Sequence, residues 1–274
     1  MIFVKSEDLK YGMRLAKPIY NKTGVLLYER NTRLTLQGIE SVKNFGLLGL
    51  YILEPAEPVP PMSEEDLDFE RFQTMAVFSI REELDNIIAG REPINLKRLA
   101  NAIITNYGRL DHKITFTQNL RSTTDYVYKH VINTAILCAL ISAQVYYTPT
   151  EQEELVLAAL LHDIGKLLLP NKVREKYDDY DTNDLIIVKK IQNDGLGLLR
   201  PEIGIDSGVR RIVAQIHRME YGNSNLEQGK ILKSTKILKV ANLFDTMTCM
   251  KISEEAISEI AAIKYLLLNK DEFD

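Results

Sequence analysis

The residues with the clearest chemical potential are histidines that lie inside apolar stretches. The chain has four histidines, His112, His130, His162 and His217, and the last three fall in segments with helical periodicity, where an imidazole is a poor core residue. His162 is followed directly by Asp163 in the sequence LLHDIGK. An adjacent histidine and aspartate near a helix end offer a neutral nitrogen and an anionic oxygen from one rigid element, which suits a divalent metal ion.

Two further residues of this motif favour phosphate chemistry. Gly165 allows the chain to turn after the helix, and Lys166 brings a cation within reach of a bound phosphate. Packing alone does not require His130, His162 and Asp163 together. We therefore favour a binding or catalytic site over a structural helical module whose histidines have no function.

The elements that must position these residues are expected to be helices. From Glu64 onward the hydrophobic period changes from about two residues to about 3.6, and breakers such as Pro149, Gly195 and Gly197 separate the periodic segments. Helices are predicted over residues 64–90, 95–108, 123–146, 151–165, 182–193, 206–220, 234–249 and 253–268. The predicted fold class is therefore mainly α, with a helical domain over residues 64–274.

Residues 1–53 have a different pattern and are predicted to form a small β-rich module. Short apolar runs alternate with turn signals, chiefly Gly12 and the sequence NKTG at 21–24, and one amphipathic segment near 35–44 indicates a short helix. Four prolines lie between Pro55 and Pro61, which disfavours a helix or a central strand. We therefore predict an extended, Pro-rich linker over residues 54–63.

Charge and composition argue against several kinds of partner. Lysine and arginine number 34 and aspartate and glutamate 38, so the net charge is −4, with no overall electrostatic footprint for DNA. Cys138 and Cys249 have no paired spacing, which indicates free thiols in a reducing compartment. The sequence shows neither a secretory signal pattern nor a long uncharged apolar stretch. We expect a cytoplasmic protein that binds neither DNA nor a membrane.

Four motifs, in this order along the chain, resemble those of the HD superfamily of metal-dependent phosphohydrolases, and of its HD-GYP branch in particular. DYVYKH at 125–130 resembles the helix with the first histidine ligand, and HDIGK at 162–166 resembles the superfamily signature. QIH at 215–217 falls where the HD-GYP branch has a histidine pair, and VANLFD at 240–245 resembles the helix with the last aspartate. The match covers about half of the chain, and residues 1–53 resemble a module often found ahead of HD-GYP domains.

The resemblance implies a metal site on the helical domain. The corresponding ligand positions in this chain are His130, His162, Asp163, Asn242 or Asp245, and His217. The first three form the single-metal set, the late helix supplies a fourth member, and His217 would serve a second ion. Asp163 and Lys166 would be the catalytic residues. Nitrogen and oxygen ligands of this kind suit Mn²⁺, Fe²⁺, Ni²⁺ or Zn²⁺ without selecting among them.

The chain departs from the HD-GYP pattern at positions that would bind the second ion. Ile191 stands where the branch begins its HPxxG stretch with a histidine, and Ile216 replaces the first member of the histidine pair. The GYP tripeptide is absent, because NSNL follows Gly222. Since isoleucine cannot coordinate a metal, we expect one ion more readily than two.

Two functions are compatible with a partly equipped site. One ion can polarise a phosphoryl oxygen and activate water, but the loss of a two-metal clamp costs on the order of several kcal/mol of transition-state stabilisation. The first function is therefore a phosphohydrolase of reduced or altered activity toward a cyclic dinucleotide such as cyclic di-GMP, or toward another phosphoester. The second is a catalytically inactive signalling module that binds a nucleotide or a partner protein. A homodimer is compatible with either function.

Overall fold

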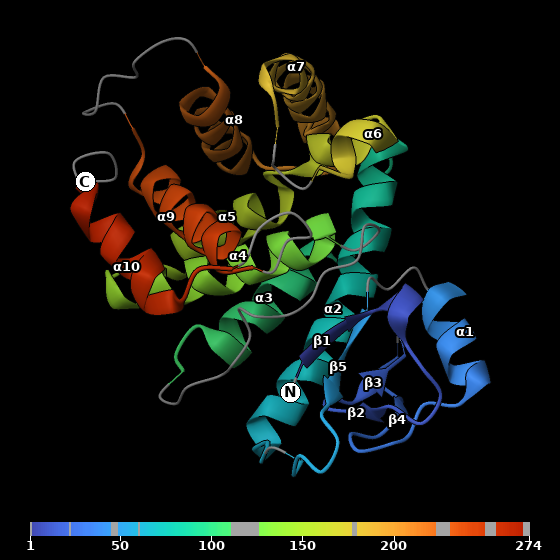
Figure 1. Cartoon of the computed structure of the whole chain (residues 1–274). Helices are drawn as coiled ribbons and strands as arrows, with labels where there is room; N and C mark the ends of the chain where they lie inside the picture. Colours follow the sequence, from blue (N-terminus) through green and yellow to red (C-terminus); the bar gives the residue numbers. More distant parts are fainter. Residues whose placement is uncertain are drawn as a thin grey trace.

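The computed structural model of the chain describes residues 2–21, 23–44, 49–59, 61–110, 126–176, 180–222, 231–249 and 256–270. It has a helical body preceded by a small β-rich module, which confirms the predicted fold class (Figure 1). His112, Asp125 and the NSNL segment at 223–226 lie outside the described residues.

The N-terminal module consists of short strands and one helix. Its elements are β1 (Ile2–Lys5), the 3-10 turn η1 (Ser6–Asp8), β2 (Arg14–Leu15), β3 (Ile19–Tyr20), β4 (Leu26–Tyr28), α1 (Leu36–Asn44) and β5 (Gly49–Leu53). β5 pairs in antiparallel orientation with both β1 and β2, and β3 forms a hairpin with β4. Apolar side chains such as Leu15, Ile39 and Ile52 give the module a core of its own.

The module packs against the first half of α2 (Glu64–Ile88). The ammonium of Lys17 lies 2.7 Å from a carboxylate oxygen of Glu70, and both side chains are partly buried. Gly24 has a positive φ of 76° between β3 and β4, and a Cβ at this position would lie 2.7 Å from the sulfur of Met75. Glycine therefore serves both the turn and the contact with α2.

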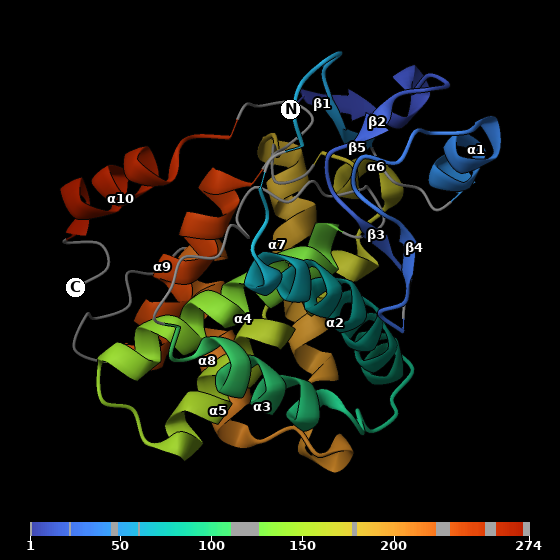
Figure 2. The ribbon, with the colours of Figure 1, turned by 90° about the horizontal axis from the view of Figure 1, so that it is seen from below.

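The helical body is built around α4. Its helices are α2, α3 (Leu96–Tyr107), α4 (Tyr126–Gln144), α5 (Pro149–Leu161), α6 (Asn171–Arg174), α7 (Thr182–Leu198), α8 (Ser207–Tyr221), α9 (Lys233–Thr248) and α10 (Glu259–Leu268), with the 3-10 turns η2 (Ile164–Leu168) and η3 (Pro201–Ile203). α4 contacts α2, α3, α5 and α9, and Figure 2 shows it at the centre of the body.

The central position of α4 explains its composition. Among the described residues, α4 alone is long and apolar enough to cross a membrane, but 72% of its apolar window is buried inside the fold. A helix that is apolar on all sides is typical of a protein core as well as of a membrane. The apolar character of α4 therefore follows from its packing against four other helices.

Gly195 in α7 serves close packing, and neither Gly195 nor Gly197 ends the helix. Gly195 and Gly197, which the sequence suggests as breakers, lie inside α7, and the helix continues to Leu198. A Cβ on Gly195 would lie 2.6 Å from the Cα of Gly165, and a Cβ on Gly165 would lie 2.8 Å from the Cα of Gln192. η2 and α7 therefore touch backbone to backbone, and this contact brings Gln192 beside the HDIGK motif.

Candidate metal centre

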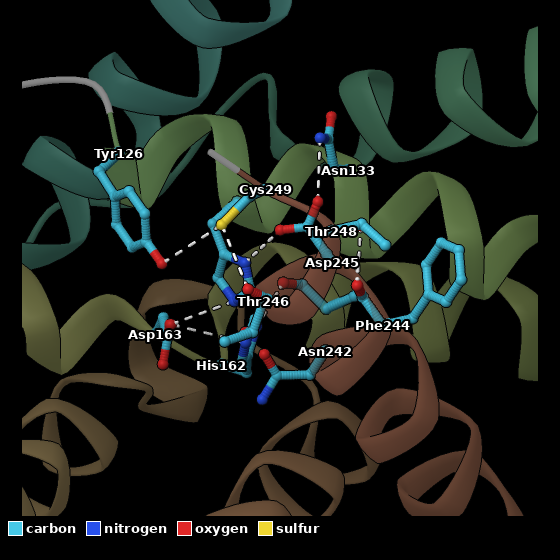
Figure 3. A network of polar contacts seen from close by, with 12 residues as sticks. Tyr126, Asn133, His162, Asp163, Asn242, Phe244, Asp245, Thr246, Thr248 and Cys249 are labelled. Carbon is cyan, nitrogen blue, oxygen red and sulfur yellow. Dashed lines mark hydrogen bonds and ion pairs between the residues drawn. The ribbon is translucent and has the colours of Figure 1, made fainter. Parts of the chain in front are cut away.

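Three buried side chains converge where α4, α5 and η2 meet. His130 lies on α4, His162 caps the C-terminus of α5, and Asp163 directly precedes η2. Their exposed fractions are 0%, 0% and 1%, and one ligand atom from each lies within 4.8 Å of the others. Nε2 of His130 is 3.4 Å and Nε2 of His162 is 3.7 Å from Oδ2 of Asp163 (Figure 3). The structure thus brings together the three residues expected for a single metal ion.

Hydrogen bonds to Nδ1 fix the orientation and the neutral tautomer of both imidazole rings. Nδ1 of His162 lies 2.8 Å from the backbone oxygen of Ala159, and Nδ1 of His130 lies 2.6 Å from Oδ2 of Asp245. Since a carbonyl or carboxylate oxygen can only accept a hydrogen bond, each Nδ1 carries the hydrogen. In a neutral ring Nε2 then keeps its lone pair, and neither Nε2 has a hydrogen-bond partner among the described residues.

Burial and local charge determine the ionisation of this group. Burial lowers the pKa of His162 to about 4, so the ring is neutral near pH 7. Burial alone would raise the pKa of Asp163, but the ammonium of Lys166, 2.8 Å from Oδ2, holds it well below its ordinary value. Two neutral nitrogens and one carboxylate are a donor set that fits Mn²⁺, Fe²⁺, Ni²⁺ or Zn²⁺.

Lys166 faces this group directly. Its side chain lies on η2, and its Nζ is 2.8 Å from Oδ2 of Asp163, the oxygen nearest both histidines. The residue is 6% exposed, so the ammonium compensates a buried negative charge. A divalent cation on Oδ2 would have to share this oxygen with the ammonium or displace it.

The two expected candidates for a fourth ligand on α9 point to different neighbours. Asp245 is fully buried and uses one oxygen for His130 and the other, Oδ1, to accept a hydrogen bond from Nδ2 of Asn133 at 3.0 Å (Figure 3). Asn242 donates from Nδ2 to a carboxylate oxygen of Glu220 at 2.5 Å. Asp245 is thus connected to the group through His130, whereas Asn242 is directed toward α8.

His217 lies next to the group without joining it. Its Nε2 is 2.6 Å from the backbone oxygen of His162 and donates to it. Burial lowers the pKa of His217, so this ring is neutral as well. Its unprotonated Nδ1 is buried and has no hydrogen-bond partner among the described residues.

The side of Asp163 away from the histidines is occupied by an amide. Gln192, which is 1% exposed, donates from Nε2 to Oδ1 of Asp163 at 2.8 Å. The sequence does not single out Gln192; the one available signal is its place directly after Ile191, where the chain departs from the HD-GYP pattern. Ile191 packs against a small apolar cluster, and Ile216 is fully buried in the main core. Neither isoleucine offers a ligand atom.

Comparison with known proteins identifies the family of the helical body. The family model described as "HD domain" matches residues 97–274. The cyclic di-GMP phosphodiesterase response regulator RpfG of Xanthomonas campestris pv. campestris (strain 8004) is 25% identical over 134 residues, which are 47% of this chain and 35% of that protein. The chain thus spans about a third of the length of this relative.

A solved structure shares the fold along nearly the whole chain. Bd1817, a HDG"Y"P protein from Bdellovibrio bacteriovorus, superposes with a TM-score of 0.58 over 98% of this chain and 94% of its own, at 17% sequence identity. The similarity includes both the β-rich module and the helical body, because it covers residues of both. The chain therefore belongs to the HD domain family, and it resembles the HD-GYP proteins within it.

Proposed function

We propose that the helical body holds one divalent transition-metal ion on His130, His162 and Asp163 and hydrolyses a phosphoester at a reduced rate. The observation that carries this proposal is the pair of unprotonated Nε2 atoms that face one carboxylate oxygen at 3.4 and 3.7 Å in a buried group. A buried polar atom without a partner costs about 1–3 kcal/mol. A cation at this position would satisfy both nitrogens at once and would share Oδ2 with the ammonium of Lys166 or displace it.

The residues around the ion would divide the chemical work. A bound ion would supply a Lewis acid for a phosphoryl oxygen and lower the pKa of a coordinated water. Asp163 and the two histidines would hold it, and Asp245 keeps His130 in the required tautomer. Lys166 would turn its ammonium from Oδ2 of Asp163 to a phosphate oxygen.

The proposed substrate class is a cyclic dinucleotide such as cyclic di-GMP. This part of the proposal rests on the relative RpfG, whose name states that activity. The reduced rate rests on this chain's own residues. Ile191 and Ile216 cannot bind a second ion, and Gln192 occupies the second oxygen of Asp163, so the two-metal clamp on an in-line displacement would be missing.

A second function is a signalling module that binds a nucleotide or a protein partner without cleaving anything. The hydrogen bond between Gln192 and Asp163 favours it, because a neutral amide occupies the oxygen of Asp163 on which a second cation would bind. We rank it second, since the three ligand atoms and Lys166 remain together.

Nucleotide release from cyclic di-GMP and from a simple phosphodiester, with added Mn²⁺, tests the proposal. We expect slow turnover by the wild type and none by Asp163→Ala, because nothing else in the group supplies the anionic ligand. Asp194, which is exposed on α7, provides the control Asp194→Ala, which should match the wild type. Strong turnover that survives Asp163→Ala would refute the metal mechanism, and tight nucleotide binding without turnover would favour the second function.

A further inference from the structure

A chain of buried hydrogen bonds leads from α2 to His130. Nε2 of Gln73 donates to Oδ1 of Asn133 at 3.1 Å, and Nδ2 of Asn133 donates to Oδ1 of Asp245 at 3.0 Å. The other oxygen of Asp245 accepts from Nδ1 of His130 at 2.6 Å. The exposed fractions are 4% for Gln73 and 0% for the other three residues. Figure 3 shows the bond between Asn133 and Asp245.

These hydrogen bonds have one direction, in which each group donates toward Asp245. The orientation of the Asn133 amide is the critical point, because its Oδ1 and Nδ2 occupy nearly the same positions after a flip of the amide. A flipped amide would place Oδ1 against the carboxylate of Asp245, where two acceptors repel. The Nε2 donor of Gln73 stabilises the orientation in which Nδ2 faces Asp245.

The carboxylate of Asp245 in turn determines the tautomer of His130. With Asn133 donating to one oxygen, the other oxygen accepts the hydrogen on Nδ1. This arrangement leaves Nε2 unprotonated toward Asp163. Partners of this kind behind a metal-bound histidine fix the ring and raise its basicity, and their loss typically lowers metal affinity by about 10–100-fold.

We propose that Gln73 and Asn133 are positioning residues of the metal centre. They orient the carboxylate of Asp245 and thereby hold His130 in the tautomer whose Nε2 faces the metal position. This inference deepens the proposed function, and the expected effect on metal affinity rests on that function. The expected effect on the tautomer of His130 concerns the protein without metal and does not depend on it.

Gln73→Glu is the sharpest variant, because it keeps the shape of the side chain and removes the donor. A carboxylate at this position draws Nδ2 of Asn133 toward itself and turns Oδ1 to Asp245. We expect His130 to lose its fixed Nδ1–H tautomer and the affinity for Mn²⁺ to fall on the order of tenfold. Gln73→Met, which removes the donor without reversing the chain, should cause a smaller loss of affinity.

Gln152 provides a matched control on α5. Its Nε2 donates to the backbone oxygen of Ala139 and to the hydroxyl of Ser142, both on α4. Gln152→Glu therefore makes the same chemical change against the same helix, at a position whose hydrogen bonds do not lead to Asp245. The tautomer of His130 and the Mn²⁺ affinity should both remain those of the wild type.

Side-chain ¹⁵N NMR of the metal-free full chain reports which nitrogen of His130 carries the hydrogen, and calorimetric titration with Mn²⁺ reports the affinity. A changed tautomer in Gln73→Glu, with no change in Gln152→Glu, is the expected result, whether or not the wild type binds Mn²⁺. An unchanged His130 spectrum in Gln73→Glu overturns the inference. If that variant does not fold, Gln73→Met decides: faster solvent exchange of the His130 Nδ1 hydrogen supports the inference, and an unchanged rate overturns it.

Discussion

Gln192 and Asp163 are joined by a hydrogen bond of 2.8 Å from Nε2 to Oδ1, and both side chains are 1% exposed. The two oxygens of Asp163 therefore have different surroundings. Oδ2 faces two histidines and Lys166, whereas Oδ1 faces a neutral amide. A second cation that bridged through Asp163 would have to displace this amide.

This relationship predicts what is needed for a second ion. Ile191→His together with Ile216→His should still leave about one ion per chain, because Gln192 keeps Oδ1 occupied. Adding Gln192→Ala to the pair should allow a second ion to bind. Elemental analysis after loading with Mn²⁺ measures both. Gln192→Ala alone is the control and should leave the stoichiometry unchanged; two ions in the double variant would show that the amide does not matter.

Lys166→Met should destabilise the protein without metal and make metal binding more favourable. The variant leaves the buried carboxylate of Asp163 without its ammonium partner, a change that typically costs about 3–5 kcal/mol. It also removes the cation that competes for Oδ2. Urea denaturation with chelator and with Mn²⁺ tests both effects.

The control for this variant is Lys172→Met, which changes an exposed lysine on the neighbouring α6. It should behave like the wild type in both conditions. If Mn²⁺ stabilises Lys166→Met no more than it stabilises the wild type, the ammonium and the ion do not compete for Asp163.

The sequence could predict the helices and the members of the three-residue group, because each signal is local. Helical periodicity locates α4 and α5, and the HDIGK motif identifies His162 and Asp163 as neighbours at a helix end. The contact of η2 with α7 depends on glycines at 165 and 195 that face each other across the fold. No local sequence signal indicates the contact between Gly165 and Gly195, so the sequence alone suggests that Gly195 is a helix breaker.

The hydrogen-bond partners behind the group could not be predicted for the same reason. Gln73 and Asn133 are 60 residues apart in the chain, and each is an ordinary polar residue on a helix. Only the packing of α2 on α4 brings their amides together. The family resemblance could identify Asp245 as a candidate metal ligand. That its carboxylate faces Nδ1 of His130 follows only from the packing of α9 on α4.

In the presence of a chelator, the free energy of unfolding should fall as the pH is lowered from about 6.5 to about 4. The pKa of His162 is about 4 in the folded chain, below its ordinary value of 6.5, so the unfolded chain binds more protons in this window. Acid therefore favours unfolding, by at most about 1.4 kcal/mol per pH unit for one such group. Burial lowers the pKa of His217 in the same direction.

Urea denaturation at several pH values measures this slope. His162→Gln removes one contributor and should flatten the dependence, while His217 contributes to what remains. Asp163, whose pKa is also lowered, contributes only below its ordinary value of 3.8, outside this window. A slope that His162→Gln leaves unchanged would mean that His162 is protonated in the folded chain.

We propose that residues 54–63 are a linker between a module over 1–53 and the domain over 64–274. The described part of this segment forms neither helix nor strand. A broad-specificity protease should cut there first. Lys17→Glu should speed the release of the module by breaking the pair with Glu70, and adding Glu70→Lys should slow it again. Earlier cleavage inside the helical body would contradict this division.

Whether the three-residue group binds one metal ion is measured by the Mn²⁺ stoichiometry and affinity of the wild type, His130→Ala, His162→Ala and Asp163→Ala, with Asp194→Ala as the exposed control. We expect about one ion per chain in the wild type and in Asp194→Ala, and severe loss of binding in the other three, because each removes one of three converging ligand atoms. A wild type with two fully occupied ions, or binding that persists unchanged in Asp163→Ala, would contradict it.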